Sequence, residues 1–153
     1  MITQPSCGRY LEVVRDELRG TVAPAVTDPA AQAALGMIDS ILASVAARCD
    51  HEVAWMREEI ADVEACAGLV LDAGADRGGH VTTALAALRS GRSPSDHTED
   101  VRAEYDLAGE LLSRSLEAGL AHGGELAVLV RGALERRLAR EVQIRGDFSL
   151  VGR

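Results

Sequence analysis

Five residues in the middle of the chain recur at the spacing of one helix face: Arg48, His51, Trp55, Glu58 and Asp62. Steps of three and four residues place side chains on the same side of an α-helix. Trp55 is the only tryptophan, and Trp and Arg are enriched among the residues that dominate binding at interfaces. The pattern therefore predicts a surface that binds a protein partner or a small ligand. The alternative is that Trp55 packs on a neighbouring helix of the same chain, with its ring N–H bonded to a carboxylate.

The same region supplies residue types that bind divalent metals. His51 with Glu58 or Glu59 could meet His122 and Glu125 from another segment, since imidazole and carboxylate groups are common metal ligands. Helical di-iron proteins carry Glu-x-x-His on two of their helices, whereas this chain has only the reversed order, His122-Gly-Gly-Glu125. We therefore expect no metal site and no cofactor.

A second cluster of acids would be needed to hold Mg²⁺ between facing helices. Glu58, Glu59 and Asp62 form one cluster, but the candidates for the second are poorly spaced: Asp96, Glu99 and Asp100. A run of charges is more often a solvated helix face. A ligand- or metal-binding bundle, possibly a hydrolase that uses the first cluster with His51, is kept as the alternative function.

Motifs for nucleophilic or phosphate chemistry are missing from the sequence. There is no GxSxG motif, and no cysteine lies near a histidine in a recognisable signature. The run Gly74-Ala-Asp-Arg-Gly-Gly79 has neither a strand pattern before it nor a Lys-Ser/Thr pair after it. The sequence therefore favours a non-enzymatic protein.

The elements that would position these residues are all predicted to be helices. Hydrophobic residues make up 47% of the 153 residues and aromatic residues only 3%, and a core of Leu, Val, Ile and Ala suits helix packing. Periodicity, caps and glycine breaks predict helices at 6–23, 29–73, 80–90, 93–121 and 125–145. We predict one all-α domain over 1–153, an up-and-down bundle of about five helices around a long second helix.

The second helix begins at a strong signal, Asp28-Pro29. An apolar stripe then continues in steps of three or four, and its members are Ile38, Leu42, Val45, Cys49, Val53, Met56, Ile60, Val63, Ala67 and Val70. One unbroken helix is favoured, with a break at residues 50–52 as the alternative. Either two shorter helices flank it end to end or part of it projects, and a projecting stripe would mark an interface. We therefore expect a homodimer or a dedicated protein partner.

The first and last helices have predicted inner faces of their own. These are Cys7, Leu11, Val14, Leu18 and Val22 in the first, and Val130, Leu134, Leu138 and Val142 in the last. The last helix also carries five arginines: Arg131, Arg136, Arg137, Arg140 and Arg145. We expect them to form i,i+4 ion pairs and to complement the helix C-terminus. The alternative is docking to an acidic partner or a phosphate-bearing ligand.

Charge and cysteine usage limit the compartment and the partners. A formal net charge of −8 argues against nucleic acid or an anionic membrane as a general partner. No basic-then-apolar leader pattern opens the sequence, and no uninterrupted apolar run reaches about 18 residues. Cys7, Cys49 and Cys66 are expected to be small buried residues in a reducing environment. We predict a cytoplasmic protein.

The opening segment, Arg9-Tyr-Leu-Glu-Val-Val-Arg-Asp-Glu-Leu18 with Val22 and Pro24, is followed by a predicted helix over 33–52. Together these segments, about the first third of the chain, resemble the start of an uncharacterised bacterial helical family. That family is often encoded beside acyl-CoA dehydrogenases and aminoglycoside-phosphotransferase-like kinases. The resemblance carries over no catalytic residues, and it implies a small accessory protein that acts with a neighbouring enzyme.

Overall fold

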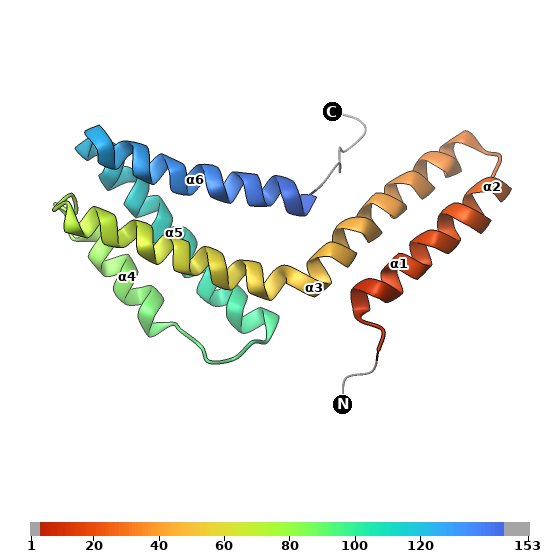
Figure 1. The fold of residues 1–153 in the computed structure, drawn as a ribbon, viewed down its shortest axis with the longest axis horizontal. Helices are drawn as coiled ribbons and strands as arrows, with labels where there is room; N and C mark the ends of the chain where they lie inside the picture. The colour runs from red at the N-terminus through yellow and green to blue at the C-terminus, as the bar shows by residue number, and fades with distance from the viewer. Residues whose placement is uncertain (1–3, 146–153) are drawn as a thin grey trace. The chain divides into compact units, whose positions relative to one another are not determined.

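The computed structural model describes residues 4–145, which form helices and connecting turns with no strand among them (Figure 1). The elements are α1 (Cys7–Glu17), the π-helical turn η1 (Leu18–Val22), α2 (Ala23–Ala25), α3 (Pro29–Asp72), α4 (His80–Ser90), α5 (Thr98–His122) and α6 (Gly124–Arg145). Residues 7–25 are continuously helical, so residues 4–145 contain five helical segments with α3 as the long second one. The predicted all-α bundle is confirmed.

The contacts divide the chain into two compact units. Unit 1 comprises Met1–His51 and Arg140–Arg153, and unit 2 comprises Glu52–Ala139. Helix α3 passes through the boundary without interruption, so the prediction of one unbroken helix is confirmed. The boundary nevertheless falls between His51 and Glu52, inside the stretch that the sequence offered as a break. That residues 1–153 form one domain stays a prediction.

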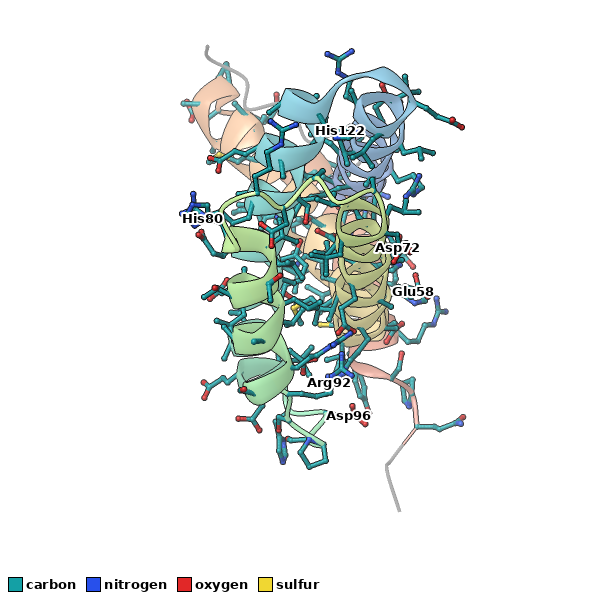
Figure 2. All side chains as sticks on the ribbon, turned by 90° about the vertical axis from the view of Figure 1, so that its left-hand side faces the viewer. Glu58, Asp72, His80, Arg92, Asp96 and His122 are labelled. Carbon is teal, nitrogen blue, oxygen red and sulfur yellow. The ribbon has the colours of Figure 1, made fainter. Side chains whose placement is uncertain are left out.

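Unit 2 has a contiguous apolar core to which four helices contribute. The second half of α3 supplies the part of its apolar stripe from Met56 to Val70, and α4 supplies Val81, Leu85 and Leu88. Helix α5 supplies Val101, Ala108 and Leu112, which are buried, and Tyr105 and Leu116 pack against the core. The side chains that fill this unit appear between the ribbons in Figure 2. A core without tryptophan, built from branched aliphatic residues, is what the composition predicted.

Two aspartates fix where helices begin. The Ala31 N–H donates to Asp28 Oδ2 at 2.8 Å, so Asp28 caps α3 as predicted. Helix α4 is capped from within the preceding loop, because Asp76 accepts from the Val81 N–H at 3.1 Å and from the Thr82 N–H at 2.9 Å. Burial opposes ionisation of Asp76, but these bonds outweigh it and lower its pKa. Helix starts are therefore fixed by local polar chemistry.

Two predicted helix boundaries are wrong. Pro24 does not end the first helix, because the wider π-turn of η1 precedes it and the chain stays helical to Ala25. Helix α5 begins at Thr98 and not at residues 93–95. The reason is Arg57, whose guanidinium donates to the carbonyls of Ser93 at 3.1 Å and Ser95 at 2.7 Å and so holds this loop open.

The inner faces of the first and last helices also differ from prediction. In α1 only Gly8 is buried, and Val14 is exposed. In α6 the buried apolar residues are Leu126, Val130 and Ala133, while Leu138 and Val142 are exposed. Each of these helices has apolar residues on more than one side. Helix periodicity alone does not tell which side packs against a neighbouring helix.

Candidate functional site

Unit 1 contains a helical hairpin in which α1 runs antiparallel to the first half of α3 (Figure 1). The start of α1 lies against the end of this half, since the Ser6 hydroxyl donates to Asp50 Oδ2 at 3.4 Å. One turn inward, a Cβ built on Gly8 would lie 3.0 Å from the Ala46 carbonyl oxygen. Helix backbones approach this closely only where a residue has no side chain. The contact fixes which side of each helix faces the other.

A charged triplet fixes the same orientation further along the hairpin. Asp39 of α3 accepts from Arg15 Nε at 3.1 Å and from Arg19 at 2.6 Å. Burial opposes ionisation of Asp39, but the bonds from the two arginines outweigh it and lower its pKa. The Arg15 side chain is only 12% exposed. The pairing partner lies 24 residues away, so the helix pattern of α1 could not reveal it.

An exposed apolar surface lies beside these contacts. We call it the hairpin face, and it comprises Cys7, Tyr10 and Val14 of α1 with Ile38, Ile41, Val45 and Cys49 of α3. Both cysteines are exposed, and the other five residues have relative exposures of 40–54%. Large apolar side chains gathered on a surface usually mark an interaction site.

A one-residue offset places both halves of this surface on the same side of the hairpin. Apolar residues of the hairpin face come one position before residues that contact the other helix. Val14 precedes Arg15, and Ile38 precedes Asp39. Further instances are Cys7 before Gly8, Val45 before Ala46 and Cys49 before Asp50. Consecutive side chains on an α-helix point about 100° apart. In two antiparallel helices, the residues just before the contact residues therefore point to the same side of the pair. The hairpin face is therefore one continuous surface.

The first half of α3 is apolar or small on nearly every side. Asp39 is its sole charge between Pro29 and Ala47, and an all-round apolar helix is normally buried. Yet α3 contains an 18-residue window of mean hydropathy 1.5 of which only 6% is buried. By length and composition α3 could cross a membrane, a weak criterion that core helices also meet. The first half of α3 is thus far less covered than its composition would predict.

The five residues predicted as a binding surface all lie on α3, but the unit boundary divides them. Arg48 and His51 belong to unit 1, whereas Trp55, Glu58 and Asp62 belong to unit 2. Arg48 and Trp55 are half-buried and the other three are exposed. Figure 2 shows Glu58 on the side of α3 that points away from α4. That these residues bind a partner or ligand stays a prediction.

The acids proposed for the alternative function do not converge on other acids. Glu59 Oε1 accepts from the Tyr105 hydroxyl at 2.8 Å and from Arg137 Nε at 2.9 Å, and Arg137 also lies over the Tyr105 ring at 5.5 Å. Burial and the Glu59 carboxylate raise the pKa of Tyr105. In the described part of the chain no group of three His, Cys, Asp or Glu could hold a metal ion. Glu59 and Arg137 form a structural bridge between α3, α5 and α6.

A second buried network was missed by the sequence analysis. Glu104 of α5 is only 1% exposed, and its Oε2 accepts from Arg57 at 2.6 Å and from the Ser93 N–H at 3.5 Å. Arg92 lies 3.5 Å from the other oxygen of Glu104 and also pairs with Glu64. The sequence does show a glutamate, Glu104, among the apolar residues of α5. Since a buried acid almost always has a partner, this position could have indicated a buried ion pair. The network anchors the α4–α5 loop.

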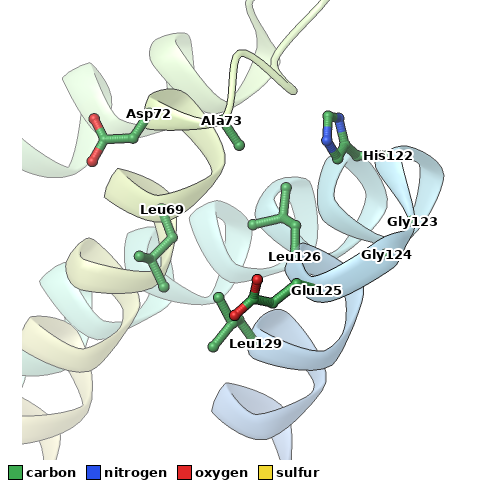
Figure 3. A pocket seen from close by; sticks show the side chains of 9 residues that line it. All are labelled: Leu69, Asp72, Ala73, His122, Gly123, Gly124, Glu125, Leu126 and Leu129. Atoms are coloured by element: carbon green, nitrogen blue, oxygen red, sulfur yellow. The ribbon is translucent and has the colours of Figure 1, made fainter.

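A pocket of about 460 Å³ lies where α3 ends and α6 begins (Figure 3). Leu69, Leu126 and Leu129 line it, and Asp72 and Glu125 stand at its edge. Figure 3 shows the Asp72 carboxylate pointing away from His122. A chemical site needs polar groups that converge on a ligand, and these side chains do not converge.

The thiols also differ from prediction. Cys66 is buried, and burial raises the pKa of its thiol, but Cys7 and Cys49 are exposed. Cys7 and Cys49 were assigned to a core because they continue apolar stripes, and those stripes form the hairpin face. The thiols are thus natural reporters of what covers this surface.

Comparison with known proteins gives no guide to function. No protein-family model matches the chain, and no curated protein or solved structure matches it significantly. The resemblance of the first third to an uncharacterised bacterial helical family therefore stays a prediction.

Proposed function

We propose that this protein is a non-enzymatic helical interaction protein of the cytoplasm that works as a homodimer or with a dedicated protein partner. The docking surface is the hairpin face. The observation that carries the proposal is the exposure of the first half of α3, which has one charge in 19 residues and should be buried.

The composition of α1 supports a protein rather than a lipid bilayer as the covering surface. Residues 7–25 carry six charges: Arg9, Glu12, Arg15, Asp16, Glu17 and Arg19. Two of these, Arg15 and Arg19, tie α1 to α3 through Asp39. If the first half of α3 entered a bilayer, α1 would have to separate from it or enter the bilayer as well. Entry would bury the charged side chains of α1 in lipid, which is costly in free energy.

The buried acids of unit 2 already have structural partners, which is consistent with the proposal. Glu59 pairs with Arg137 and accepts a hydrogen bond from the Tyr105 hydroxyl, and Glu104 pairs with Arg57. Groups engaged in this way fasten the helices of unit 2 to each other. The resemblance of the first third of the chain would fit an accessory role beside an enzyme.

The test is a charge placed on the hairpin face. Val45→Asp should leave the helix content unchanged and should reduce self-association or partner binding at least tenfold, because an unpaired carboxylate would be buried on docking. Sedimentation and circular dichroism measure the two effects. The matched control is Val128→Asp on α6, since Val128 is 65% exposed but lies outside the face. Equal behaviour of the two variants would contradict the proposal.

A further inference from the structure

We propose that the hairpin face is covered by the hairpin face of a second copy of this chain, and that the two hairpins form an antiparallel four-helix bundle. This inference rests on the proposed function and names its partner. In the bundle, α3 of one copy would run in the opposite direction to α3 of the other. Each copy would place its unit 2 at a different end.

The dimensions of the hairpin suit this arrangement. Residues 29–51 of α3 are about 34 Å long at ~1.5 Å per residue, and two helices side by side are about 20 Å wide. This whole side of the hairpin has a projected area of roughly 700 Å² per copy, and the hairpin face, which spans residues 38–49 of α3, fills about half of it. The two hairpins must therefore meet along their full length to approach the ~800 Å² that each partner contributes to a standard interface. Two antiparallel pairs packed face to face bury a shared core, which is the usual solution for helical hairpins.

The distribution of charge favours self-association through this surface. No member of the hairpin face is charged, so two copies of the face can meet without placing like charges opposite each other. A two-fold interface requires such self-complementarity, because the same patch serves both partners. Homodimer interfaces are also more apolar than transient ones.

The charge of unit 2 selects the antiparallel direction. Residues 52–139 contain 16 acidic residues and nine arginines, so they hold −7 of the net charge of −8. Unit 2 is connected to the hairpin at the His51 end. A parallel bundle would attach both acidic units at one end, where they would repel each other, whereas an antiparallel bundle attaches them at opposite ends.

Cysteine cross-linking of the full-length protein tests both the partner and the direction. Ile38 lies near the midpoint of residues 29–51, and Cys49 lies near the end. In an antiparallel bundle two copies of Ile38 would be offset by about 6 Å along the axis and two copies of Cys49 by about 27 Å, at ~1.5 Å per residue. The variant Ile38→Cys with Cys7→Ser and Cys49→Ser is compared with the single variant Cys7→Ser, using a bismaleimide of short reach. Cys66 is buried in both and serves as the internal control.

We expect a dimer by native mass spectrometry, efficient cross-linking through position 38 and little through Cys49. Efficient cross-linking at both positions would mean a parallel bundle, and inefficient cross-linking at both would mean that the hairpins do not meet along their full length. Either result would overturn the inference while leaving the proposed function intact. A monomer at all concentrations would also overturn it, and the hairpin face would then require a different protein. A monomer that binds phosphatidylcholine vesicles, with binding lost in Val45→Asp, would overturn the inference and the proposed function together.

Discussion

Arg15 of α1 donates to Asp39 of α3 across 3.1 Å, and this ion pair decides which residues of the hairpin meet solvent. Because both side chains point between the helices, the preceding residues Val14 and Ile38 are turned outward on one side. Asp39 also binds Arg19 of η1 at 2.6 Å, so one carboxylate holds both α1 and the helical turn that follows it. The exposed apolar surface is thus a consequence of a polar contact.

The triplet should make hairpin stability depend on pH. The pKa of Asp39 is lowered in the folded protein, so its contribution is fully present above the unfolded pKa of ~3.9 and is lost as pH falls through the folded pKa. We expect Asp39→Asn to reduce the free energy of unfolding by about 1.5–3 kcal/mol at pH 7. The difference from wild type should shrink towards acid pH. Urea titrations at several pH values measure it, and a constant difference would contradict the assigned role.

The close crossing of α1 and α3 predicts opposite effects at two glycines. Gly8→Ala should destabilise the hairpin, because the new Cβ would lie 2.5 Å from Asp50 Oδ2 and 3.0 Å from the Ala46 carbonyl oxygen. We expect a loss of about 1–3 kcal/mol, as for other overpacked sites. Gly20→Ala meets nothing within 4 Å and should be neutral or stabilising. Thermal unfolding of the two variants provides the comparison, and equal shifts would rule out a close crossing at Gly8.

The network around Glu104 should dominate the stability of unit 2. Glu104→Gln removes the charge that faces Arg57 and Arg92, and breaking a buried pair costs about 3–5 kcal/mol. Glu110→Gln is the control, since the pair of Glu110 with Arg114 is exposed and such pairs contribute about 0–1 kcal/mol. Chemical denaturation measures both. A small effect at Glu104 would mean that its oxygens are well satisfied by neutral donors.

Thiol reactivity should report the covering of the hairpin face. Cys66 is buried with a raised thiol pKa, so it should be alkylated only on unfolding. Cys7 and Cys49 should react readily in dilute protein and more slowly as concentration rises, because a second copy would cover them. Mass spectrometry of timed alkylation resolves the three sites. Rates independent of concentration would speak against self-association through this surface.

Much of the local structure could be predicted because it depends on neighbours in sequence. The period of apolar residues, the Asp28 cap and the glycine breaks specified the helices at 29–72, 80–90 and 124–145 to within a residue. The unbroken path of α3 followed from a stripe that stays in phase across His51. These features need only the geometry of one helix and its ends.

The partners of individual side chains could not be predicted in this way. Glu59 with Tyr105 and Arg57 with Glu104 are 46 and 47 residues apart, and nothing local distinguishes a paired acid from a solvated one. Arg137 had been placed among i,i+4 pairs, yet it reaches Glu59 on another helix.

The sequence by itself determined that this chain is helical, where the helices at 29–72, 80–90 and 124–145 begin and end, and that one of them is too apolar to stand alone. Only the tertiary structure decided which stripe of each helix became core. In unit 2 the stripe of α3 meets three helices and is buried, while in unit 1 the same stripe lies beside the contact line with α1 and stays exposed. The reason is physical: helix periodicity defines a stripe, but burial depends on how many neighbours surround it, and α1 turns a polar contact line towards α3.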